Sequence, residues 1–547
     1  MAFDTNLTPE RSRLYTQNGL WCGKNLIEYF DAAVARTPNK TAVVAPGARM
    51  TYAELDAQTN SVAAHLRALG IRKGDVISVQ LPNCPEFVTV HLAASRLGVV
   101  TNSLLHIYRD ADVSYIMGKA RTAAVFIPQF YRKFDYPTMY ANIWPSLPDL
   151  KHVFVLGGEG LPGMKSFETL RAPTGAATAR VATEPYSGDD VCALVFTSGT
   201  ESKPKGVMHS HNTLMYSTLS MAKLLGLNAD DSVWTPSPVG HGTGFLWGVR
   251  QAITLGATVV LQDIWDPDEA LRLIARERCT FTMAATPFAA MLLESPLVGT
   301  LDLSSFRIFA CAGTAIPQKL GMDMRKRLGC TLIGMWGMSE CAVGSASPPS
   351  DPGEKLWGTD GKAVIGAELA IFDDTRTHML PTGEVGELAS RGPHVALGYF
   401  NDPERTKETF RADGWLFTGD LAKMDADGYI RLVGRKKEII NRGALKISVA
   451  QMEEYLVSHP KVLSVAMVGV PDERLGEKSC AFVVTRNEAT TSLKEINDFL
   501  DEHKVAKYKF PEYLVLLREL PTTPSGKIQK FVLRDGFIKG RYEVLTQ

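Results

Sequence analysis

The sequence predicts an α/β protein, made of a large layered region and a smaller α+β domain behind it. Three observations lead to this prediction. The chain has 547 residues, which is more than one hydrophobic core usually organises. Short apolar runs alternate with helical patterns through most of its length, and the alternation changes near Gly434, where a densely charged stretch begins. An α/β body followed by a separate compact domain accounts for all three observations.

Strand and helix signals follow each other in the first part of the chain. Thr51 and Glu54 have the spacing of a capping box, and apolar residues at helical spacing come after them. Residues 76–81 form an apolar run that predicts a buried strand, and a second helical pattern follows it. The same order returns at 258–261, a predicted strand, where Asp266 and the proline behind it mark the start of the next helix.

The C-terminal part of the chain has a different character. A charged stretch at 434–438 is followed by two predicted strands, 462–470 and 481–485, with helical patterns around them. This arrangement predicts an α+β domain of about 110 residues, which is a usual domain size. We therefore place one domain at 1–435 and a second at 436–547.

Composition limits the classes of function. Lys plus Arg and Asp plus Glu both number 59, so no overall charge attracts the chain to nucleic acid or to an anionic membrane. No uncharged apolar run is long enough to span a bilayer, and residues 1–13 lack the apolar core of a secretory signal. The eight cysteines form no CxxC pair of the kind that binds zinc. We expect a cytoplasmic protein with reduced thiols, no nucleic-acid partner and no integral membrane segment.

A loop rich in hydroxyl groups follows the apolar strand predicted at 191–196 and carries the first functional signal. It reads Thr197-Ser198-Gly199-Thr200-Glu201-Ser202-Lys203-Pro204-Lys205-Gly206. Its hydroxyls and backbone N–H groups can surround a polyphosphate, and Lys205 would add positive charge. The residue order of a Walker A loop is absent from it. A simple turn also explains this loop taken alone, so the interpretation depends on the motifs that follow.

Six further motifs come in order along the chain. They are Gly334-Met335-Trp336-Gly337-Met338-Ser339-Glu340, Gly386-Glu387-Leu388, Gly398-Tyr399-Phe400-Asn401, Trp415-Leu416-Phe417-Thr418-Gly419-Asp420, Gly434-Arg435-Lys436-Lys437 and Pro524-Ser525-Gly526-Lys527-Ile528. Together with the hydroxyl-rich loop, they resemble the adenylate-forming superfamily of acyl-CoA synthetases, aryl-CoA ligases, firefly luciferase and peptide-synthetase adenylation domains. The resemblance spans nearly the whole chain. It implies a large N-terminal domain with two sheets and a small β-barrel, and a mobile C-terminal domain that turns about a hinge at Lys437.

The resemblance also implies an ATP site. Lys527 would carry the adenylation step, because an ammonium group can cancel the charge that gathers on the α-phosphate and the incoming carboxylate. Glu340 would bind Mg²⁺ together with Thr200, and Asp420 would accept the ribose hydroxyls beside Arg435. Taken singly, Glu340 is equally a helix-start glutamate, and Asp420 and Arg435 a surface ion pair. The residues implied for ATP or AMP binding are Thr197, Ser198, Gly199, Thr200, Lys205, Gly313, Thr314, Ala315, Gly334, Met335, Trp336, Gly337, Ser339, Asp420 and Arg435.

The second half-reaction would transfer the acyl group to coenzyme A. In the family, the small domain turns and brings a strand toward the adenylate, and the resemblance assigns Gly443, Ala444 and Lys446 of this chain to that strand. Close relatives have two adjacent glycines there, so the Cβ of Ala444 could obstruct the path of the thiol. Two alternatives stay open: an enzyme that stops at the adenylate or uses another acceptor, and a nucleotide-binding protein without catalysis.

The sequence narrows the acid only in part. Pro238-Val239-Gly240-His241-Gly242-Thr243-Gly244-Phe245 resembles the acyl-pocket motif of the family, with His241 near the substrate carboxylate, although an isolated histidine is also a common structural residue. Trp336 stands where tyrosine is usual and adds bulk between adenylate and acid. Other segments resemble short- and medium-chain fatty acyl-CoA synthetases and cyclohexanecarboxylate–CoA ligases. We therefore expect a small aliphatic or alicyclic acid such as cyclohexanecarboxylate, with ATP and CoA as co-substrates, and leave a homodimer open as the assembly.

Overall fold

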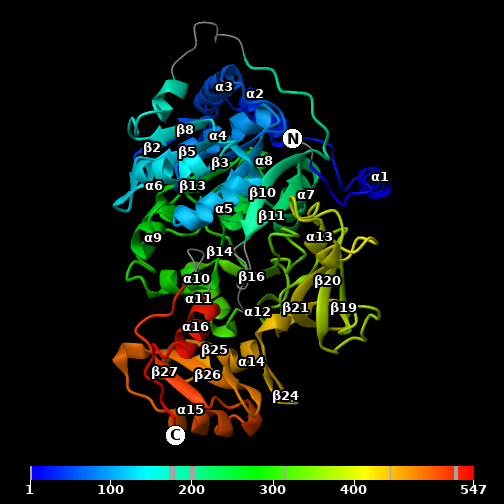
Figure 1. The fold of residues 1–547 in the computed structure, drawn as a ribbon, viewed down its shortest axis with the longest axis vertical. Helices are drawn as coiled ribbons and strands as arrows, with labels where there is room; N and C mark the ends of the chain where they lie inside the picture. The colour runs from blue at the N-terminus through cyan, green and yellow to red at the C-terminus, as the bar shows by residue number, and fades with distance from the viewer. Residues whose placement is uncertain are drawn as a thin grey trace. The chain divides into compact units, whose positions relative to one another are not determined.

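The computed structural model describes residues 3–171, 180–197, 204–312, 316–443, 445–522 and 528–546. The chain divides into two compact units, whose ribbons are drawn in Figure 1. The larger unit contains Met1–Ser198, Pro204–Leu369 and Ser390–Leu416, and the smaller unit contains Ala370–Ala389 and Phe417–Gln547. A large α/β body with a smaller α+β domain is the fold class that the sequence predicts, and the structure confirms it.

A nine-stranded mixed sheet is the first layer of the larger unit. Its central strands are parallel, in the order β16-β15-β14-β12-β13-β1, and β2, β17 and β18 join antiparallel at the two ends. Because neighbouring strands are parallel, their carboxyl ends open at one edge of the sheet. The strands are β1 (Thr41–Ala45), β2 (Ala48–Thr51), β12 (Ser232–Thr235), β13 (Thr258–Leu261), β14 (Phe281–Ala284), β15 (Ile308–Cys311), β16 (Thr331–Trp336), β17 (Ser345–Ala346) and β18 (Lys362–Ala363).

A seven-stranded sheet is the second layer, in the order β11-β10-β4-β3-β5-β8-β9. All its neighbours pair in parallel except β10 and β11, which are antiparallel and bring Thr197 opposite Lys205. The two ends of the hydroxyl-rich loop therefore lie side by side. The strands are β3 (Val76–Val79), β4 (Val100–Ser103), β5 (Thr122–Pro128), β8 (His152–Leu156), β9 (Lys165–Ser166), β10 (Val191–Thr197) and β11 (Lys205–Ser210), with a separate hairpin of β6 (Phe130–Tyr131) and β7 (Phe134–Asp135).

Local sequence signals explain where several helices begin. The predicted capping box forms: the Thr51 side chain accepts from the Glu54 N–H at 3.2 Å, and the Thr51 N–H donates to the Glu54 carboxylate at 2.7 Å. Asp266 caps the next predicted helix by accepting from the Glu269 N–H at 2.7 Å. The helices of the larger unit are α1 (Pro9–Gln17), α2 (Leu26–Arg36), α3 (Tyr52–Ala68), α4 (Pro85–Arg96), α5 (Asp110–Ala120), α6 (Tyr136–Ile143), α7 (His211–Leu225), α8 (Gln251–Leu255), α9 (Pro267–Arg276), α10 (Thr286–Glu294), α11 (Gln318–Leu328), α12 (Gly353–Gly358) and α13 (Pro403–Thr409), with a π-helix η3 (Thr243–Arg250).

The cysteines are structural thiols, as the sequence predicts. All eight lie in the described ranges and are free, and six of them are buried. Burial raises the pKa of Cys192 to about 11 and that of Cys279 to about 12, so these thiols stay protonated and unreactive at neutral pH. Within the described ranges, no helix is both long enough and apolar enough to cross a lipid bilayer.

The smaller unit packs helices on both faces of a five-stranded sheet. Side chains alternate along β25: Val465 and Met467 belong to the cluster that contains α14 and α15 residues, while Ala466 and Val468 belong to the cluster that contains Leu533 of α16. The strands predicted at 462–470 and 481–485 are confirmed. The elements are β23 (Ile439–Arg442), β24 (Leu445–Ser448), β25 (Val462–Asp472), β26 (Gly476–Thr485), β27 (Tyr513–Leu516), α14 (Val449–Val457), α15 (Leu493–Glu502) and α16 (Lys530–Ile538).

The residues at which the chain passes from one unit to the other lie in a four-stranded sheet. At the position where the resemblance implies a small β-barrel, the described strands follow the order β19-β20-β21-β22. The units divide the chain earlier than 435/436, at Leu416/Phe417, and the smaller one also takes in Ala370–Ala389. The hinge at Lys437 concerns a movement and stays a prediction. The strands are β19 (Glu368–Phe372), β20 (Gly386–Arg391), β21 (Leu416–Met424) and β22 (Ile430–Arg435).

A lysine between two glutamates links three elements of the smaller unit. The Lys530 Nζ, at the start of α16, lies 3.1 Å from Glu438 Oε2 and 3.0 Å from Glu453 Oε1. Burial raises the pKa of Glu453, and the charge of Lys530 only partly offsets this effect. Burial alone would lower the pKa of Lys530, but its two glutamate partners outweigh that effect and raise it. The ammonium group of Lys530 is therefore the charge that offsets both carboxylates.

We predict that Lys530→Met lowers the unfolding free energy of the smaller unit by about 2 kcal/mol, because it leaves the charge of Glu453, whose side chain is only 21% exposed, without its cation. A carboxyl whose folded pKa is raised contributes stability at low pH and loses it as pH rises. The deficit of the variant should therefore be smaller at pH 5 than at pH 8. Calorimetric unfolding of the full chain at both pH values measures it.

Lys539→Met is the matched control for this prediction. Lys539 follows the same helix and pairs with Asp535, but both side chains are about half exposed, and such pairs contribute little. An equal loss from both variants, or a Lys530→Met deficit that does not change with pH, would contradict the prediction.

Candidate active site

The functional motifs of the larger unit meet at one edge of the nine-stranded sheet. Strands β12, β14, β15 and β16 are parallel neighbours, so the segments that leave their carboxyl ends share that edge. The segment after β12 holds His241, and residues 334–340 lie at the end of β16 and in the segment that follows it. Sequence motifs that are about a hundred residues apart therefore converge here, as ligand sites in parallel sheets do.

Glu340 lies in a tight loop behind β16. The chain turns back on itself, with the Gly344 N–H donating to the Trp336 carbonyl at 2.9 Å. A Cβ at Gly337 would come within 2.0 Å of the Ala342 carbonyl, so only glycine fits this turn. Within it, Glu340 is only 6% exposed, and its Oε1 accepts a hydrogen bond from the Tyr399 hydroxyl at 2.7 Å.

Lys205 lies on the other side of the same tyrosine. It is the first residue of β11, and its Nζ is 4.9 Å from the centroid of the Tyr399 ring. The sequence assigns Lys205 to phosphate and Glu340 to Mg²⁺, and the structure brings both against one side chain. Tyr399 stands in the Gly398-Tyr399-Phe400-Asn401 motif, whose role could not be read from the sequence.

A buried histidine ties the Glu340 loop to β11. The His209 Nε2 donates to the Ser339 carbonyl at 2.7 Å. Burial lowers the pKa of His209 to about 4, and the hydrogen bond to Ser339 only partly opposes this shift. At neutral pH the ring is therefore uncharged, and it acts as a fixed donor that holds Ser339 in place. No sequence signal distinguishes His209 from the other histidines.

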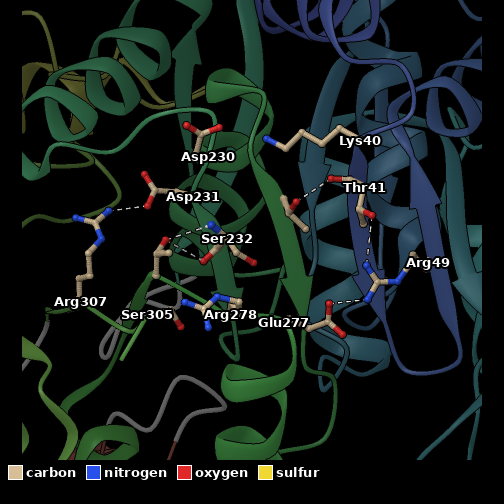
Figure 2. A pocket seen from close by; sticks show the side chains of 12 residues that line it. Lys40, Thr41, Arg49, Asp230, Asp231, Ser232, Glu277, Arg278, Ser305 and Arg307 are labelled. Carbon is tan, nitrogen blue, oxygen red and sulfur yellow. Dashed lines mark hydrogen bonds and ion pairs between the residues drawn. The ribbon is translucent and has the colours of Figure 1, made fainter. Parts of the chain in front are cut away.

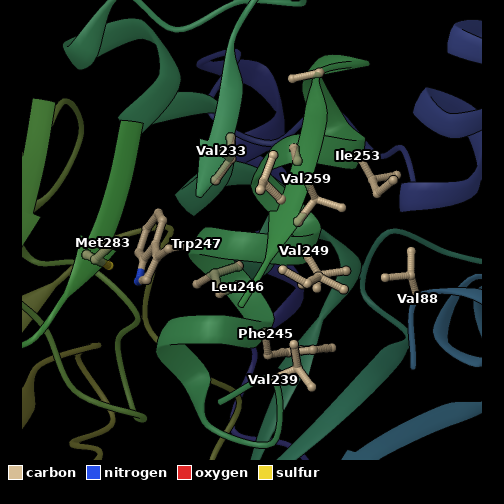
Figure 3. Close-up of a cluster of buried hydrophobic side chains, with 14 of the residues drawn as sticks. Val88, Val233, Val239, Phe245, Leu246, Trp247, Val249, Ile253, Val259 and Met283 are labelled. Carbon is tan, nitrogen blue, oxygen red and sulfur yellow. The ribbon is translucent and has the colours of Figure 1, made fainter. Parts of the chain in front are cut away.

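The segment predicted to line the acyl pocket continues into a π-helix. The Thr243 N–H donates to His241 Nδ1 at 3.2 Å, just before η3 begins. In Figure 3, Trp247 lies beside Met283 of β14, and Phe245 lies beside Val239. π-Helical turns are rare and are frequent at functional sites. The segment thus continues from its histidine into a run of buried apolar side chains.

Trp336 closes β16 within the larger unit. Met335 and Trp336 are each only 3% exposed. A Cβ at Gly344 would come within 2.2 Å of the Trp336 ring, so the loop presses against the indole. The bulk that the sequence assigns to this position is therefore a buried wall.

In the smaller unit, Asp420 and Arg435 form an ion pair, which is the alternative that the sequence leaves open for these two residues beside ribose binding. They are opposite residues of the antiparallel strands β21 and β22, and the Arg435 Nε lies 2.9 Å from Asp420 Oδ1. The Asp420 side chain is 6% exposed and that of Arg435 is 42% exposed. A carboxylate held from one side by a guanidinium can still accept hydrogen bonds from other hydroxyl groups.

Glu387 is a charged centre whose role could not be inferred from its motif. Its fully buried carboxylate accepts two hydrogen bonds from Arg376, at 3.0 and 2.7 Å, and one from Lys436 at 3.2 Å. Burial alone would raise the pKa of Glu387, but Arg376 and Lys436 outweigh it and leave the pKa below its ordinary value. The ion pairs fix Lys436, the residue before the predicted hinge Lys437.

Gly443 and Lys446, predicted to take part in CoA transfer, lie in the smaller unit beside Ala444. Gly443 has a φ of 62°, a conformation that favours glycine. The Lys446 Nζ is 3.5 Å from Asp374, and both side chains are largely exposed. Several predicted site residues fall outside the described residues: Ser198, Gly199, Thr200, Gly313, Thr314, Ala315, Ala444 and Lys527. Their roles stay predictions.

The residues around Glu340 fit a magnesium ion better than a metal that needs a full set of protein ligands. Among the described residues, no group of three or more His, Cys, Asp or Glu side chains is placed to bind a metal. Mg²⁺ usually keeps several waters and is held by one or two carboxylates plus substrate phosphates. A single buried carboxylate, with the ammonium group of Lys205 against the same tyrosine, suits that mode.

The described part of the larger unit also has a surface cavity of about 580 Å³, at the opposite edge of the sheet (Figure 2). Ser232 begins β12, Thr258 begins β13, and Arg307 precedes β15. Cations in the cavity are paired with acids, as in Arg307–Asp231 and Arg49–Glu277, both at 2.6 Å. Because it lies at the amino ends of the strands, this cavity is separate from the candidate active site.

Comparison with known proteins gives two family matches that together span most of the chain. Residues 30–400 match the AMP-binding enzyme family, and residues 451–527 match the AMP-binding enzyme C-terminal domain. The chain is 38% identical to a medium-chain fatty-acid–CoA ligase of Escherichia coli (strain K12), over 97% of this chain and 93% of that protein. It is 33% identical to a 2-hydroxy-7-methoxy-5-methyl-1-naphthoate–CoA ligase of Streptomyces carzinostaticus, over 95% and 94%. A crystal structure of an anthranilate CoA ligase with anthranoyl-AMP superposes with a TM-score of 0.86, at 27% identity, over 95% and 98%.

Proposed function

Since the chain belongs to the AMP-binding enzyme family and is an AMP-forming acid–CoA ligase, we propose that it activates a short-chain, medium-chain or alicyclic carboxylic acid. In the first step, ATP and the acid give an acyl-adenylate and pyrophosphate. In the second step, the acyl group passes to coenzyme A and AMP is released.

One observation of the larger unit carries this proposal: Glu340 and Lys205 both contact Tyr399. A cation beside a buried carboxylate is the arrangement that a polyphosphate with its magnesium ion requires. Lys205 would bind phosphate oxygens, and Glu340, together with Thr200, would hold Mg²⁺. The ion would supply positive charge against the phosphates.

The adenylation step needs charge cancellation rather than a general base. A carboxylate oxygen of the acid attacks the α-phosphorus, the bond from that phosphorus to the bridging oxygen breaks, and pyrophosphate leaves with the electron pair. Negative charge gathers on the α-phosphate as the two anions approach. We assign its cancellation to Lys527, with His241 at the substrate carboxylate.

The predicted ATP-binding residues divide into those for the adenine and those for the ribose. Residues 334–336, with 313–315, would contact the adenine. Asp420 would accept hydrogen bonds from the ribose hydroxyls, and its pairing with Arg435 supports this role because the guanidinium group orients the carboxylate.

The thioester step would follow a rotation of residues 436–547 about Lys437. The CoA sulfur then attacks the acyl carbon, the bond from that carbon to the phosphate oxygen breaks, and AMP leaves. Gly443, Ala444 and Lys446 would line the path of the thiol. The ion pairs that hold Lys436 against Glu387 support a fixed point immediately before the hinge.

Two classes of acid compete for the pocket. The E. coli relative is named for medium-chain fatty acids, whereas the naphthoate and anthranilate ligases are named for aromatic acids. The buried Trp336 wall and the apolar π-helix suit an apolar acid of limited length, which favours the aliphatic class. An aromatic acid is the second candidate.

We expect pyrophosphate release with the wild-type chain to be fastest for medium straight-chain acids or cyclohexanecarboxylate, at least about tenfold above benzoate and anthranilate in kcat/KM, because each methylene in an apolar pocket contributes a comparable factor. A panel of these acids, with a long-chain acid as the test of pocket length, measures this order. A preference for benzoate or anthranilate would favour the aromatic candidate instead.

We predict that Lys527→Ala reduces acid-dependent pyrophosphate release by at least about a hundredfold, because it removes the cation that stabilises the transition state. ATP binding, measured by calorimetry, should remain largely intact. Lys539→Ala is the control, since Lys539 is an exposed lysine behind the next helix. Unchanged pyrophosphate release in Lys527→Ala would refute the role of this lysine.

We predict that Ala444→Gly speeds thioester formation roughly fivefold, the effect of removing about 1 kcal/mol of backbone and Cβ hindrance, and leaves acyl-adenylate formation unchanged. Single-turnover assays with and without CoA separate the two steps. If the wild type and Ala444→Gly both accumulate acyl-AMP and form no thioester, that result favours the alternative function, which is adenylation alone or transfer to another acceptor.

A further inference from the structure

We propose that Tyr399 is a positioning residue for adenylation, which orients the carboxylate of Glu340 with its hydroxyl group and holds the ammonium group of Lys205 on the face of its ring. The inference rests on the proposed function, in which Glu340 binds Mg²⁺ and Lys205 binds phosphate.

The hydroxyl group can act only as a donor to Glu340. Tyr399 is 3% exposed. A carboxylate oxygen accepts hydrogen bonds, so the 2.7 Å contact is the phenol O–H donating to Glu340 Oε1. A bond to Oε1 fixes the plane of that carboxylate, and so the direction in which Oε2 points.

The ring binds the second charge. The Lys205 Nζ lies 4.9 Å from the ring centroid, within the range of a cation–π contact. The edge of the Phe410 ring packs against the same tyrosine, with centroids 5.3 Å apart and planes at 74°. The ring cannot turn without losing this packing. One fixed tyrosine side chain therefore positions both the ammonium group of Lys205 and the carboxylate of Glu340.

Backbone hydrogen bonds hold the tyrosine between the two charged residues. The Phe400 N–H donates to the Gly206 carbonyl at 2.7 Å, and the Met208 N–H donates to the Gly398 carbonyl at 3.0 Å, which joins the segment to β11. On the other side, the Ala396 N–H donates to the Glu340 carbonyl at 2.9 Å. Residues 396–400 are thus connected to the strand of Lys205 and to the loop of Glu340 at once.

The flanking residues of the motif have conformations that serve this placement. Gly398 has a φ of 106°, and a Cβ there would come within 2.8 Å of the Thr406 side chain. The Thr406 hydroxyl accepts from the Tyr399 N–H at 2.9 Å. Asn401 has a φ of 50°, in the left-handed region that asparagine tolerates better than most residues. These features explain a glycine before the tyrosine and an asparagine two positions after it.

The test compares the dependence on magnesium in Tyr399→Phe and in the wild type. The variant keeps the ring for Lys205 and loses the hydroxyl bond to Glu340. We expect the Mg²⁺ concentration for half-maximal pyrophosphate release to rise about tenfold, as losing a hydrogen bond to a charged group predicts, with kcat at saturating Mg²⁺ close to that of the wild type. Tyr399→Leu, which also removes the ring, should in addition raise the KM for ATP at saturating Mg²⁺.

Binding without catalysis gives a second readout. By calorimetry in the absence of acid, Mg²⁺ should improve the affinity for ATP about tenfold less in Tyr399→Phe than in the wild type. Tyr52→Phe is the matched control: Tyr52 is fully buried in the larger unit, and its hydroxyl donates to the Ala257 carbonyl at 2.7 Å. It should lower thermal stability without changing either magnesium measurement.

The outcomes separate the inference from the function on which it rests. An unchanged magnesium requirement in Tyr399→Phe, or a loss that added Mg²⁺ does not restore, overturns the positioning role. If Glu340→Gln changes the magnesium requirement while Tyr399→Phe does not, only this inference fails. If the wild type releases no pyrophosphate with any acid, the proposed function fails first.

Discussion

Parallel pairing in the nine-stranded sheet is the constraint on which the larger unit depends. Because β12, β14, β15 and β16 run in the same direction, each connection must return the chain to the amino edge before the next strand starts. Every segment that leaves a strand therefore opens at the same carboxyl edge. The segments that hold His241 and Glu340 share that edge for this reason, whereas the amino edge holds paired charges around a surface cavity.

Buried carboxylates are the second recurring feature, and each one has different hydrogen-bond or ion-pair partners. Glu340 accepts a hydrogen bond from a neutral phenol, which orients it without cancelling its charge. Glu387 is fully paired with Arg376 and Lys436, which suits a structural anchor. Asp420 pairs with an arginine that is itself half exposed. The charge and the exposure of the partner thus differ from one carboxylate to the next.

Local features of the fold could be predicted from the sequence because they depend on neighbouring residues. The Thr51–Glu54 box and the Asp266 cap are interactions between residues three apart, and they form as expected. The contacts of Tyr399 with Glu340, 59 residues away, and of His209 with Ser339, 130 residues away, depend on how the sheets pack. No spacing rule reaches across such distances, so the motif that contains Tyr399 could be recognised but not explained.

The site was accessible from sequence mainly through resemblance. Glu340, Asp420 and Arg435 follow from motifs, and the structure gives them the burial or pairing that their proposed roles need. Glu387 also belongs to a motif, but its ion pair could not be predicted because its partner Arg376 lies outside every motif. The boundary between the compact units also differs from the one set at the charged stretch, since composition does not record which strands pack together.

The π-helix η3 gives the acyl-pocket segment an unusual route to variation. A π-helical stretch holds more residues per turn than an α-helix of the same length. Deleting one residue within Thr243–Arg250 would allow the segment to relax to α-helical winding while the residues after it kept their places. The side chains within the segment, Trp247 among them, would then be redistributed around the axis without any substitution. Insertions and deletions, and not only exchanges of side chains, are thus a means by which descendants of this chain could acquire new acids.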